Sequence, residues 1–431
     1  MTHSGGDRCK GPPRPVRLRC WEGPCHWATW LVAWLAVGVL GASAAGSEGR
    51  PTGKRLRVPA DYPTISAAIA AAASGDRVLV SPGVYHEALR LAGKEITLAS
   101  LYLDSGDEAH IRQTVLDGRL PQPKGRTKTA DAVITVDSSC GPQTRIVGFT
   151  IQNGDDGISC HARIRIEHNR FFNNGDAIDY EGGGGLCQHN YFENNRDDAV
   201  DLDGACAVVI AHNRMLASRD DGIEIRLHDY TGPELEIVIR DNVILDSRED
   251  GIQIIDYPGR SARQIRIERN VIARTAMAAI GCMGNGRTEE NYEAADVQEP
   301  IYVLNNTLVD NEYGISGGHA LVAVNNIIVG TRKTALKKVD GQSVVAFTLL
   351  WNNGRDNDGS NLQTTSILAK DPLLGPGWRL SAGSPAIDAG TATFQWQGQR
   401  VLDLSPKDYA GATPDLGAIE FGLAAAPTSA R

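Results

Sequence analysis

The stretch NYFENNRDDAV at residues 190–200 recurs as NRMLASRDDGI at 213–223 and as NVILDSREDGI at 242–252. Each copy begins with Asn, alternates apolar with other residues, passes through a polar turn, and ends with a small residue before Ile or Val. Looser copies begin at Asn169, Asn270, Asn306 and Asn326. Short strands and turns that repeat in this way predict a β-solenoid, whose coils bury apolar residues only against neighbouring coils.

The Asn that begins each copy forms a column in such a solenoid. We expect its side chain to bond to the turn backbone of the next coil, because adjacent strands lie about 4.8 Å apart. Two other segments carry recognisable motifs: VPADYPTISAAIAAAASGDRVLVSPGVYHE at 58–87, and GSPAIDAG with PDLGAIEFG at 383–422. With the repeat, they make residues 55–421 resemble the right-handed parallel β-helix superfamily of pectate lyases, polygalacturonases and alginate epimerases.

This resemblance implies an all-β, right-handed parallel β-helix with a short N-terminal cap helix at about 64–73. We expect the solenoid and its cap at 58–350 and a closing segment at 351–422, after a linker at 45–57 and before a disordered tail at 423–431.

The N-terminus has the features of an export signal. Basic residues precede the apolar run WATWLVAWLAVGVLG at 27–41, and ASA at 42–44 offers small residues for cleavage. Fifteen apolar residues are short for a membrane span. We therefore expect residues 1–44 to be a signal peptide and the protein to be secreted or periplasmic, without a membrane span after cleavage. An uncleaved anchor is the alternative, because the basic leader is long.

The charge of the chain bears on its partners. Removing five basic and two acidic residues with the leader takes the net charge from −9 to −12. An acidic surface argues against nucleic acid as a partner but allows an acidic polymer bound through a cation. Five cysteines remain, at 140, 160, 187, 206 and 282, and we expect them to be small core residues. We expect a monomer.

Aligning the copies on their final Ile or Val stacks acidic residues in columns. One column reads Asp156, Asp176, Asp198, Asp221 and Asp250, and the column three residues later reads Ser159, Asp179, Asp201, Glu224 and Gln253. Like charges on neighbouring strands repel each other, so they need compensation. One interpretation is a structural ladder of turns and ion pairs with Arg196, Arg219 and Arg248. The other is a divalent cation, because calcium takes six to eight oxygen ligands.

The segment DDAVD at 197–201, with Asp176 one coil earlier, resembles the calcium cluster of one β-helical pectate lyase family. That resemblance implies calcium as a cofactor, with Asp176, Asp197, Asp198 and Asp201 as its ligands. Asp220, Asp221 and Glu224 are expected to extend the cluster.

Insertions after the acidic turn lengthen successive coils at 226–236, 255–263 and 284–300. Loops at one place in stacked coils predict a wall beside the acidic residues. DYTG at 229–232 and DYPG at 256–259 place Tyr230 and Tyr257 one coil apart, where we expect them to contact a sugar ring. We expect Arg260 to bind the same substrate.

Lyases of the resembled superfamily cleave acidic polysaccharides by β-elimination, with Lys or Arg as the usual base. No Lys lies between Lys128 and Lys333, so a lyase would need another base. Arg226 is our first choice and Arg248 follows, although a clamp on the substrate carboxylate suits Arg better than proton abstraction. His228 is the other proton carrier.

Two other functions stay open. Asp176 below the pair Asp197 and Asp198, or Asp198 below the pair Asp220 and Asp221, resembles the carboxyl arrangement of polygalacturonases, which would act as inverting hydrolases. However, the Gly-His-Gly and Arg-x-Lys elements of that family are missing, as is the epimerase signature Asp-Pro-His-Asp. A solenoid that only binds carbohydrate is the third reading, because fold alone does not determine function.

Overall fold

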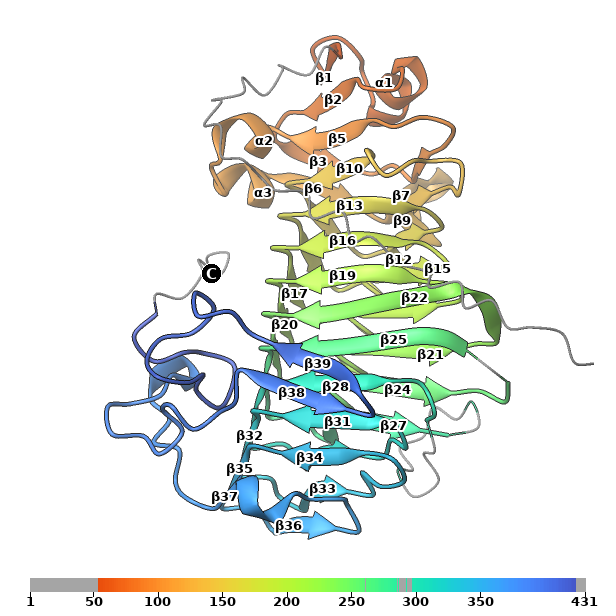
Figure 1. The fold of residues 1–431 in the computed structure, drawn as a ribbon. Helices are drawn as coiled ribbons and strands as arrows, with labels where there is room; N and C mark the ends of the chain where they lie inside the picture. Colours follow the sequence, from red (N-terminus) through yellow and green to blue (C-terminus); the bar gives the residue numbers. More distant parts are fainter. Residues whose placement is uncertain (1–52, 260, 285, 287–291, 293–296, 424–431) are drawn as a thin grey trace, which may run out of the picture. The chain divides into compact units, whose positions relative to one another are not determined.

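In the computed structural model, which describes residues 53–259, 261–284, 286, 292 and 297–423, the chain winds through three parallel sheets (Figure 1). Successive strands enter sheet A, sheet B and sheet C in turn, and each pairs with its counterpart in the next coil. The fold is a right-handed parallel β-helix, as the sequence predicts. The predicted signal peptide and most of the predicted tail lie outside the described residues.

Sheet A contains the strands that follow the insertion loops. Its strands are β1 (Arg55–Val58), β2 (Arg77–Val80), β5 (Thr97–Ser100), β10 (Arg145–Val147), β13 (Arg163–Glu167), β16 (Gly184–Gln188), β19 (Ala207–Ala211), β22 (Tyr230–Arg240), β25 (Ser261–Glu268), β28 (Ile301–Leu304), β31 (Leu321–Val324) and β34 (Val344–Ala346).

Sheet B contains short strands that follow the Asn column. Its strands are β3 (Gly83–Tyr85), β6 (Thr114–Asp117), β11 (Thr150–Gln152), β14 (Arg170–Phe172), β17 (Tyr191–Glu193), β20 (Arg214–Leu216), β23 (Val243–Leu245), β26 (Val271–Ala273), β29 (Thr307–Val309), β32 (Ile327–Val329), β35 (Thr348–Trp351) and β37 (Ile367–Leu368).

Sheet C contains the strands that follow the acidic turns in the chain. Its strands are β4 (Leu89–Leu91), β9 (Ala132–Val136), β12 (Asp156–Cys160), β15 (Ile178–Glu181), β18 (Val200–Asp203), β21 (Ile223–Leu227), β24 (Ile252–Asp256), β27 (Ala278–Met283), β30 (Tyr313–Ser316), β33 (Thr334–Lys337) and β36 (Arg355–Asp358).

The inside of the coils is a continuous apolar core. Alternate residues of each strand point inward, so Val200 and Leu202, which alternate with Asp201 and Asp203, belong to the buried core. In sheet B the rings of Phe171 and Phe192 stack with their centroids 4.9 Å apart. The cysteines that follow the leader are all free and buried, as expected of core residues.

The Asn column forms the predicted ladder. Asn190 Oδ1 accepts the backbone N–H of Asn169 at 2.9 Å, and Asn213 Oδ1 accepts that of Asn190 at 2.9 Å. The same bond continues through Asn242, Asn270, Asn306 and Asn326. Each of these Asn residues is buried, so its amide satisfies backbone groups that water cannot reach.

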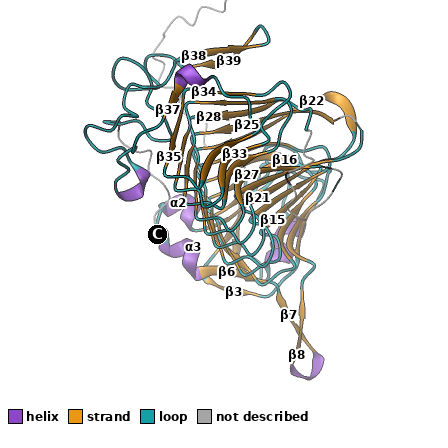
Figure 2. Cartoon of the chain, turned by 90° about the horizontal axis from the view of Figure 1, so that it is seen from below, coloured by secondary structure: helices purple, strands orange, loops and turns teal. Residues whose placement is uncertain are grey.

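Helix α1 (Ile65–Ala71) is the expected cap helix, and it packs apolar residues on the first coils. Thr64 caps its N-terminus through a bond from Ala67 N–H. Helices α2 (Tyr102–Ser105) and α3 (Ala109–Gln113) lie between β5 and β6. The hairpin β7 (Arg119–Gln122) and β8 (Arg126–Thr129) projects from the coils (Figure 2).

The predicted closing segment begins with β36 and β37, the last strands of sheets C and B, and its later part lies along the sides of the last coils. The hairpin β38 (Thr393–Trp396) and β39 (Gln399–Asp403) packs on the outer face of sheet A (Figure 1). Leu380, Ala386 and Leu416 cover the outer face of sheet B. The physical reason is that these outer faces carry apolar side chains, such as Val322, which need cover.

Candidate functional site

The turns between sheets B and C carry an aspartate ladder. Asp176 Oδ1 accepts the backbone N–H of Asp198 at 2.9 Å, and Asp198 Oδ1 accepts that of Asp221 at 2.7 Å. Asp221 Oδ1 in turn accepts the N–H of Asp250. These carboxylates therefore accept backbone N–H groups at the turn between sheets B and C, as the Asn amides do at the turn between sheets A and B. One oxygen of each is committed to the fold.

The second acidic column lies on the outer side of sheet C. Asp179 pairs in register with Asp201, Asp201 with Glu224, and Glu224 with Gln253, as the alignment of the copies predicts. We call the two columns and the neighbouring turn acids the acidic face. Its members are Asp176, Asp179, Asp197, Asp198, Asp201, Asp220, Asp221 and Glu224.

Burial and mutual repulsion raise the pKa values of these acids. Burial, followed by neighbouring carboxylates, raises the pKa of Asp176 to about 8 and that of Asp201 to about 8. The pKa of Glu224 rises to about 7, mainly through burial and against the nearby Arg226. Asp198 is only 4% exposed, and its pKa lies well above the ordinary value for the same reasons.

The arrangement of oxygens fits a cation. Oxygens of Asp176, Asp197 and Asp198 lie within 4.8 Å of one another, and so do oxygens of Asp198, Asp201 and Glu224. Asp198 thus belongs to both groups. Asp220, Asp221 and Glu249 form a third group. These clusters could hold a metal ion, and every ligand expected from the sequence belongs to one of the three groups, which add only Glu249.

Buried side-chain oxygens without a hydrogen-bond partner also favour a cation at this place. Asp201 Oδ1 and Gln253 Oε1 are buried and accept no hydrogen bond from the described part of the chain, and neither does Asp179 Oδ1. Asp201 is 5% exposed and Gln253 is 1% exposed. A buried oxygen without a partner is costly, and a hard cation such as calcium satisfies several at once. The donor set consists of oxygens only, as such cations require.

Arg226 stands among the same acids. Its guanidinium forms ion pairs with Asp201 at 3.4 Å, with Asp203 at 3.3 Å, and with Glu224. Burial alone would lower the pKa of Arg226, but these three carboxylates raise it above its ordinary value. A protonated, ion-paired guanidinium cannot accept a proton, so the geometry speaks against the expected role as base. The same geometry favours the other expected role, in which Arg226 holds a substrate carboxylate.

His228 lies next to the ion pair of Arg226 with Asp203. Its Nδ1 is 3.9 Å from Asp203 Oδ1, and its ring meets the edge of Tyr257 with centroids 4.3 Å apart. The side chain is 41% exposed, so a ligand can reach it. Arg248 is exposed on a turn and takes no part in the ion pairs of Arg226 among the described residues. Arg260 lies outside the described residues.

The two loop tyrosines do not stack on each other. The register places Leu227 beside Asp256, so Tyr257 faces His228 rather than Tyr230. Tyr230 begins β22, pairs with Ser261, and lies 5.7 Å from the guanidinium of Arg263. The two DY motifs therefore have different surroundings, because they differ in position relative to the strands. Tyr257 remains beside the acidic face.

Sequence reasoning missed two basic features. Arg263 is 2% exposed and donates to the backbone oxygens of His228 and Gly204, which ties two insertion loops together. The hairpin β7–β8 occupies the connection from sheet B to sheet C that later carries the acids. Residues 119–129 include Arg119, Lys124, Arg126 and Lys128 and no acid. That run of like charge was a readable signal.

In the part of the chain that the structure describes, no helix has the length and apolar character needed to cross a membrane.

Comparisons with known proteins agree with this architecture. Residues 132–294 match a family model described as a right-handed β-helix region. The match agrees with the right-handed parallel β-helix that the three sheets form. No curated protein matches the sequence.

Similar solved structures include three enzymes. The catalytic domain of a GH87 alpha-1,3-glucanase in complex with nigerose is 13% identical, with a TM-score of 0.49, and the match covers 75% of this chain and 68% of that one. Pectate lyase Pel9A is 15% identical, with a TM-score of 0.42 and coverage of 85% and 96%. A hyperthermoactive exopolygalacturonase from Thermotoga maritima is 13% identical, with a TM-score of 0.38 and coverage of 69% and 80%. Similarity at this level says nothing about the substrate of this chain.

Proposed function

We propose that the protein is exported, binds calcium on the acidic face, and cleaves an acidic, uronate-containing polysaccharide by β-elimination. The observation that carries the proposal is the pair of oxygen groups that share Asp198, with unpartnered buried oxygens and Arg226 beside them. Crowded carboxylates without a cation repel one another. A cation held by these oxygens would supply positive charge for the carboxylates of a uronate chain, which ion pairs within the protein would not do.

The residues of the wall suit this reaction. Arg226 holds two N–H groups near the acidic face and can clamp a substrate carboxylate with them. Bound calcium would neutralise the substrate carboxylate and so acidify the proton on the carbon next to it. His228 takes that proton, the glycosidic C–O bond on the following carbon breaks as a C=C bond forms, and the departing oxygen takes a proton from solvent. Asp203 Oδ1 lies 3.9 Å from Nδ1, where its negative charge faces the imidazole.

The hairpin β7–β8 supports an anionic partner. Its base lies beside the first acidic turn, because Asp155 N–H donates to the Ala130 carbonyl and Asp156 N–H to that of Asp131. Its exposed basic side chains therefore belong to the coil before Asp155 and Asp156, two coils before that of Asp176, on a chain whose net charge is negative. Cations on a protruding ribbon raise the local concentration of a polyanion and speed its encounter with the site.

The experiment is turnover of a panel of polygalacturonate, alginate and glucuronan by the secreted chain, in calcium and in chelator. We expect ultraviolet-absorbing unsaturated products from at least one polymer, only in calcium. His228→Ala and Arg226→Ala should abolish product formation. Arg355→Ala, in the exposed strand β36, is the control and should leave the rate unchanged. Calcium-independent turnover, or a His228→Ala variant with wild-type rate, would overturn the proposed chemistry.

An inverting hydrolase is the second candidate. The observation that favours it is the raised pKa of Asp179, about 8, which burial and the neighbouring acids keep protonated at neutral pH, as a general acid requires. The same panel separates the two reactions, because hydrolysis gives new reducing ends without unsaturation. Binding without either product would assign the acidic face to a carbohydrate-binding module.

A further inference from the structure

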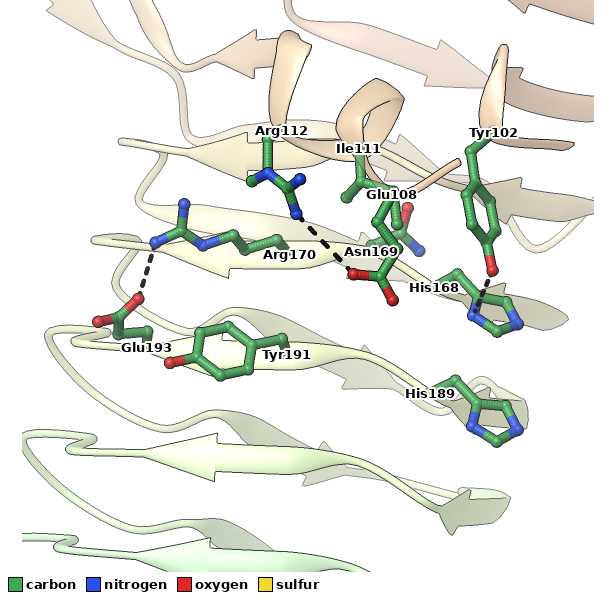
Figure 3. A pocket seen from close by; sticks show the side chains of 10 residues that line it. All are labelled: Tyr102, Glu108, Ile111, Arg112, His168, Asn169, Arg170, His189, Tyr191 and Glu193. Carbon is green, nitrogen blue, oxygen red and sulfur yellow. Dashed lines mark hydrogen bonds and ion pairs between the residues drawn. The ribbon is translucent and has the colours of Figure 1, made fainter. Parts of the chain in front are cut away.

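A cavity of about 260 Å³ lies between residues of sheet B and the segment that carries α2 and α3 (Figure 3). Helices α2 and α3 form its upper wall, and β14 and β17 form its floor. The side chains that matter here are Tyr102, Glu108, Arg112, Arg170, Tyr191 and Glu193. These residues belong to neither acidic column.

The walls are fixed by the solenoid. Tyr102 and Leu103 anchor α2 on Leu79, Ala99 and Val147 of sheet A. Tyr102 Oη is 3.1 Å from His168 Nδ1, and His168 stacks on His189 with centroids 4.9 Å apart. Thr150 Oγ1 donates to the Ile111 carbonyl at 2.9 Å and so holds α3. A cavity between such supports is preformed, which lowers the cost of ordering on binding.

The charges around the cavity balance. Glu108 is 3.8 Å from Arg112, and Glu193 is 2.8 Å from Arg170, so two acids face two guanidinium groups. Burial lowers the pKa of His168 and of His189, which keeps both imidazoles neutral near pH 7. A charged ligand would leave one charge without a partner in this lining. A neutral ligand that both donates and accepts hydrogen bonds fits it.

The apolar part of the lining favours a ring. Tyr102, Ile111 and Tyr191 line the cavity together with the charged groups. The Arg170 guanidinium is 5.9 Å from the centroid of the Tyr191 ring, which keeps that ring beside the ion pair. A pyranose has an apolar face of C–H groups and an equatorial rim of hydroxyls. Tyrosine suits the face, and paired carboxylates and guanidinium groups suit the rim.

We propose that this cavity binds one neutral pyranose unit of an oligosaccharide. Tyr191 contacts the face of the ring, while Arg112 and Arg170 donate to hydroxyl oxygens and Glu108 and Glu193 accept from hydroxyl groups. The site is separate from the acidic face and needs no cation. It would allow the protein to hold a neutral glycan on sheet B while the acidic face is free.

Calorimetric titration of the full chain, in chelator, with cellotetraose, xylotetraose, mannotetraose and β-1,4-galactotetraose tests the site. We expect at least one of these to bind the wild type, and Arg112→Ala and Tyr191→Ala to weaken it at least tenfold. Arg112 is exposed, so its loss should not affect folding, which a thermal melt checks. Arg214 follows Tyr191 in the same column of sheet B, one coil on and outside the cavity. Arg214→Ala is the control and should bind like the wild type.

Two outcomes would overturn the inference. One is a wild type that binds none of the four tetrasaccharides. The other is an Arg214→Ala variant that loses as much affinity as Arg112→Ala. Asp198→Asn should bind the neutral sugar unchanged while losing calcium, so a failure of this site and a failure of the calcium site are distinguishable.

Discussion

Asp198 combines a structural and a chemical task in one carboxylate. One oxygen accepts the N–H of Asp221 at 2.7 Å and belongs to the ladder that joins the coils. The side chain also belongs to two groups of oxygens close enough for a shared cation. An Asn at this position can keep the first task, because the amide oxygens of Asn190 and Asn213 accept the same kind of bond in the neighbouring ladder. It cannot keep the second.

We therefore predict opposite effects of Asp198→Asn with and without calcium. In chelator at pH 8 the variant should melt at least as high as the wild type, because it removes one of the repelling charges. At a calcium concentration 100 times the wild-type Kd, the wild type should gain about 2.7 kcal/mol and the variant much less. Asp155→Asn, exposed and outside the three oxygen groups, is the control. Equal calcium stabilisation of wild type and Asp198→Asn would contradict the assignment.

The pH dependence of stability follows from the raised pKa values. Asp176 and Asp201 have pKa values of about 8 in the folded chain and Glu224 about 7, against about 4 in an unfolded chain. Between pH 4 and pH 8 the folded state holds protons on these carboxyl groups that the unfolded state has lost. Their contribution to the free energy of unfolding is therefore complete below pH 4 and falls as the pH rises to 8. Thermal melts in chelator from pH 5 to pH 8 should show this fall. Calcium should abolish it and release protons on binding. A melting temperature that rises with pH in chelator would refute the prediction.

At the scale of elements, the hairpin β7–β8 and the acidic turns occupy equivalent connections in different coils. Lys124 and Arg126 are exposed and take part in no ion pair among the described residues. Arg119 and Lys128 pair with Asp117 and Asp131 at the base. A two-stranded ribbon has little core of its own, so the unpaired Lys124 and Arg126 are available to a ligand.

We predict that Lys124→Glu combined with Arg126→Glu weakens binding of the substrate polyanion at least tenfold at low salt. The difference should shrink as ionic strength rises, because screening weakens interactions between exposed charges. Binding isotherms at several salt concentrations measure it. Lys370→Glu with Lys407→Glu, which are exposed elsewhere, should change affinity much less. Equal loss in both double variants would attribute the effect to net charge alone.

At the scale of the whole described stack, the coils depend on one another for their core. The Asn ladder passes without interruption from Asn169 to Asn326. Apolar residues from the first coil to the last belong to one cluster, from Leu56 to Leu350. A break in the middle should therefore be transmitted to both sides.

We predict that Asn213→Ala destabilises the chain by at least about 2 kcal/mol, because the Asn190 N–H and the Cys187 carbonyl lose buried partners. Unfolding in urea should remain a single transition at a lower midpoint. Asn357→Ala in the exposed strand β36 is the control and should shift the midpoint little. Two separate transitions in the wild type would show that the stack is not one cooperative unit.

Much of this architecture is readable in the sequence. The repeated Asn and the alternating apolar residues specify coils, inward faces and a ladder, because these features depend on neighbours at a fixed offset. The same spacing places Asp179, Asp201 and Glu224 in one column, which the observed register bears out. The cap helix is readable too, since TISAAIAA at 64–71 offers a capping residue and a helical apolar pattern.

Only the tertiary structure determined what surrounds those columns. The ion pairs of Arg226, the contact of Tyr257 with His228 rather than Tyr230, and the buried Arg263 depend on loops of unequal length that fold back on the coils. The cavity under α2 and α3 depends on helices about 60 to 90 residues away in sequence from its floor. A repeat fixes the distance between equivalent residues in successive coils, but it does not fix where an insertion of irregular length comes to rest.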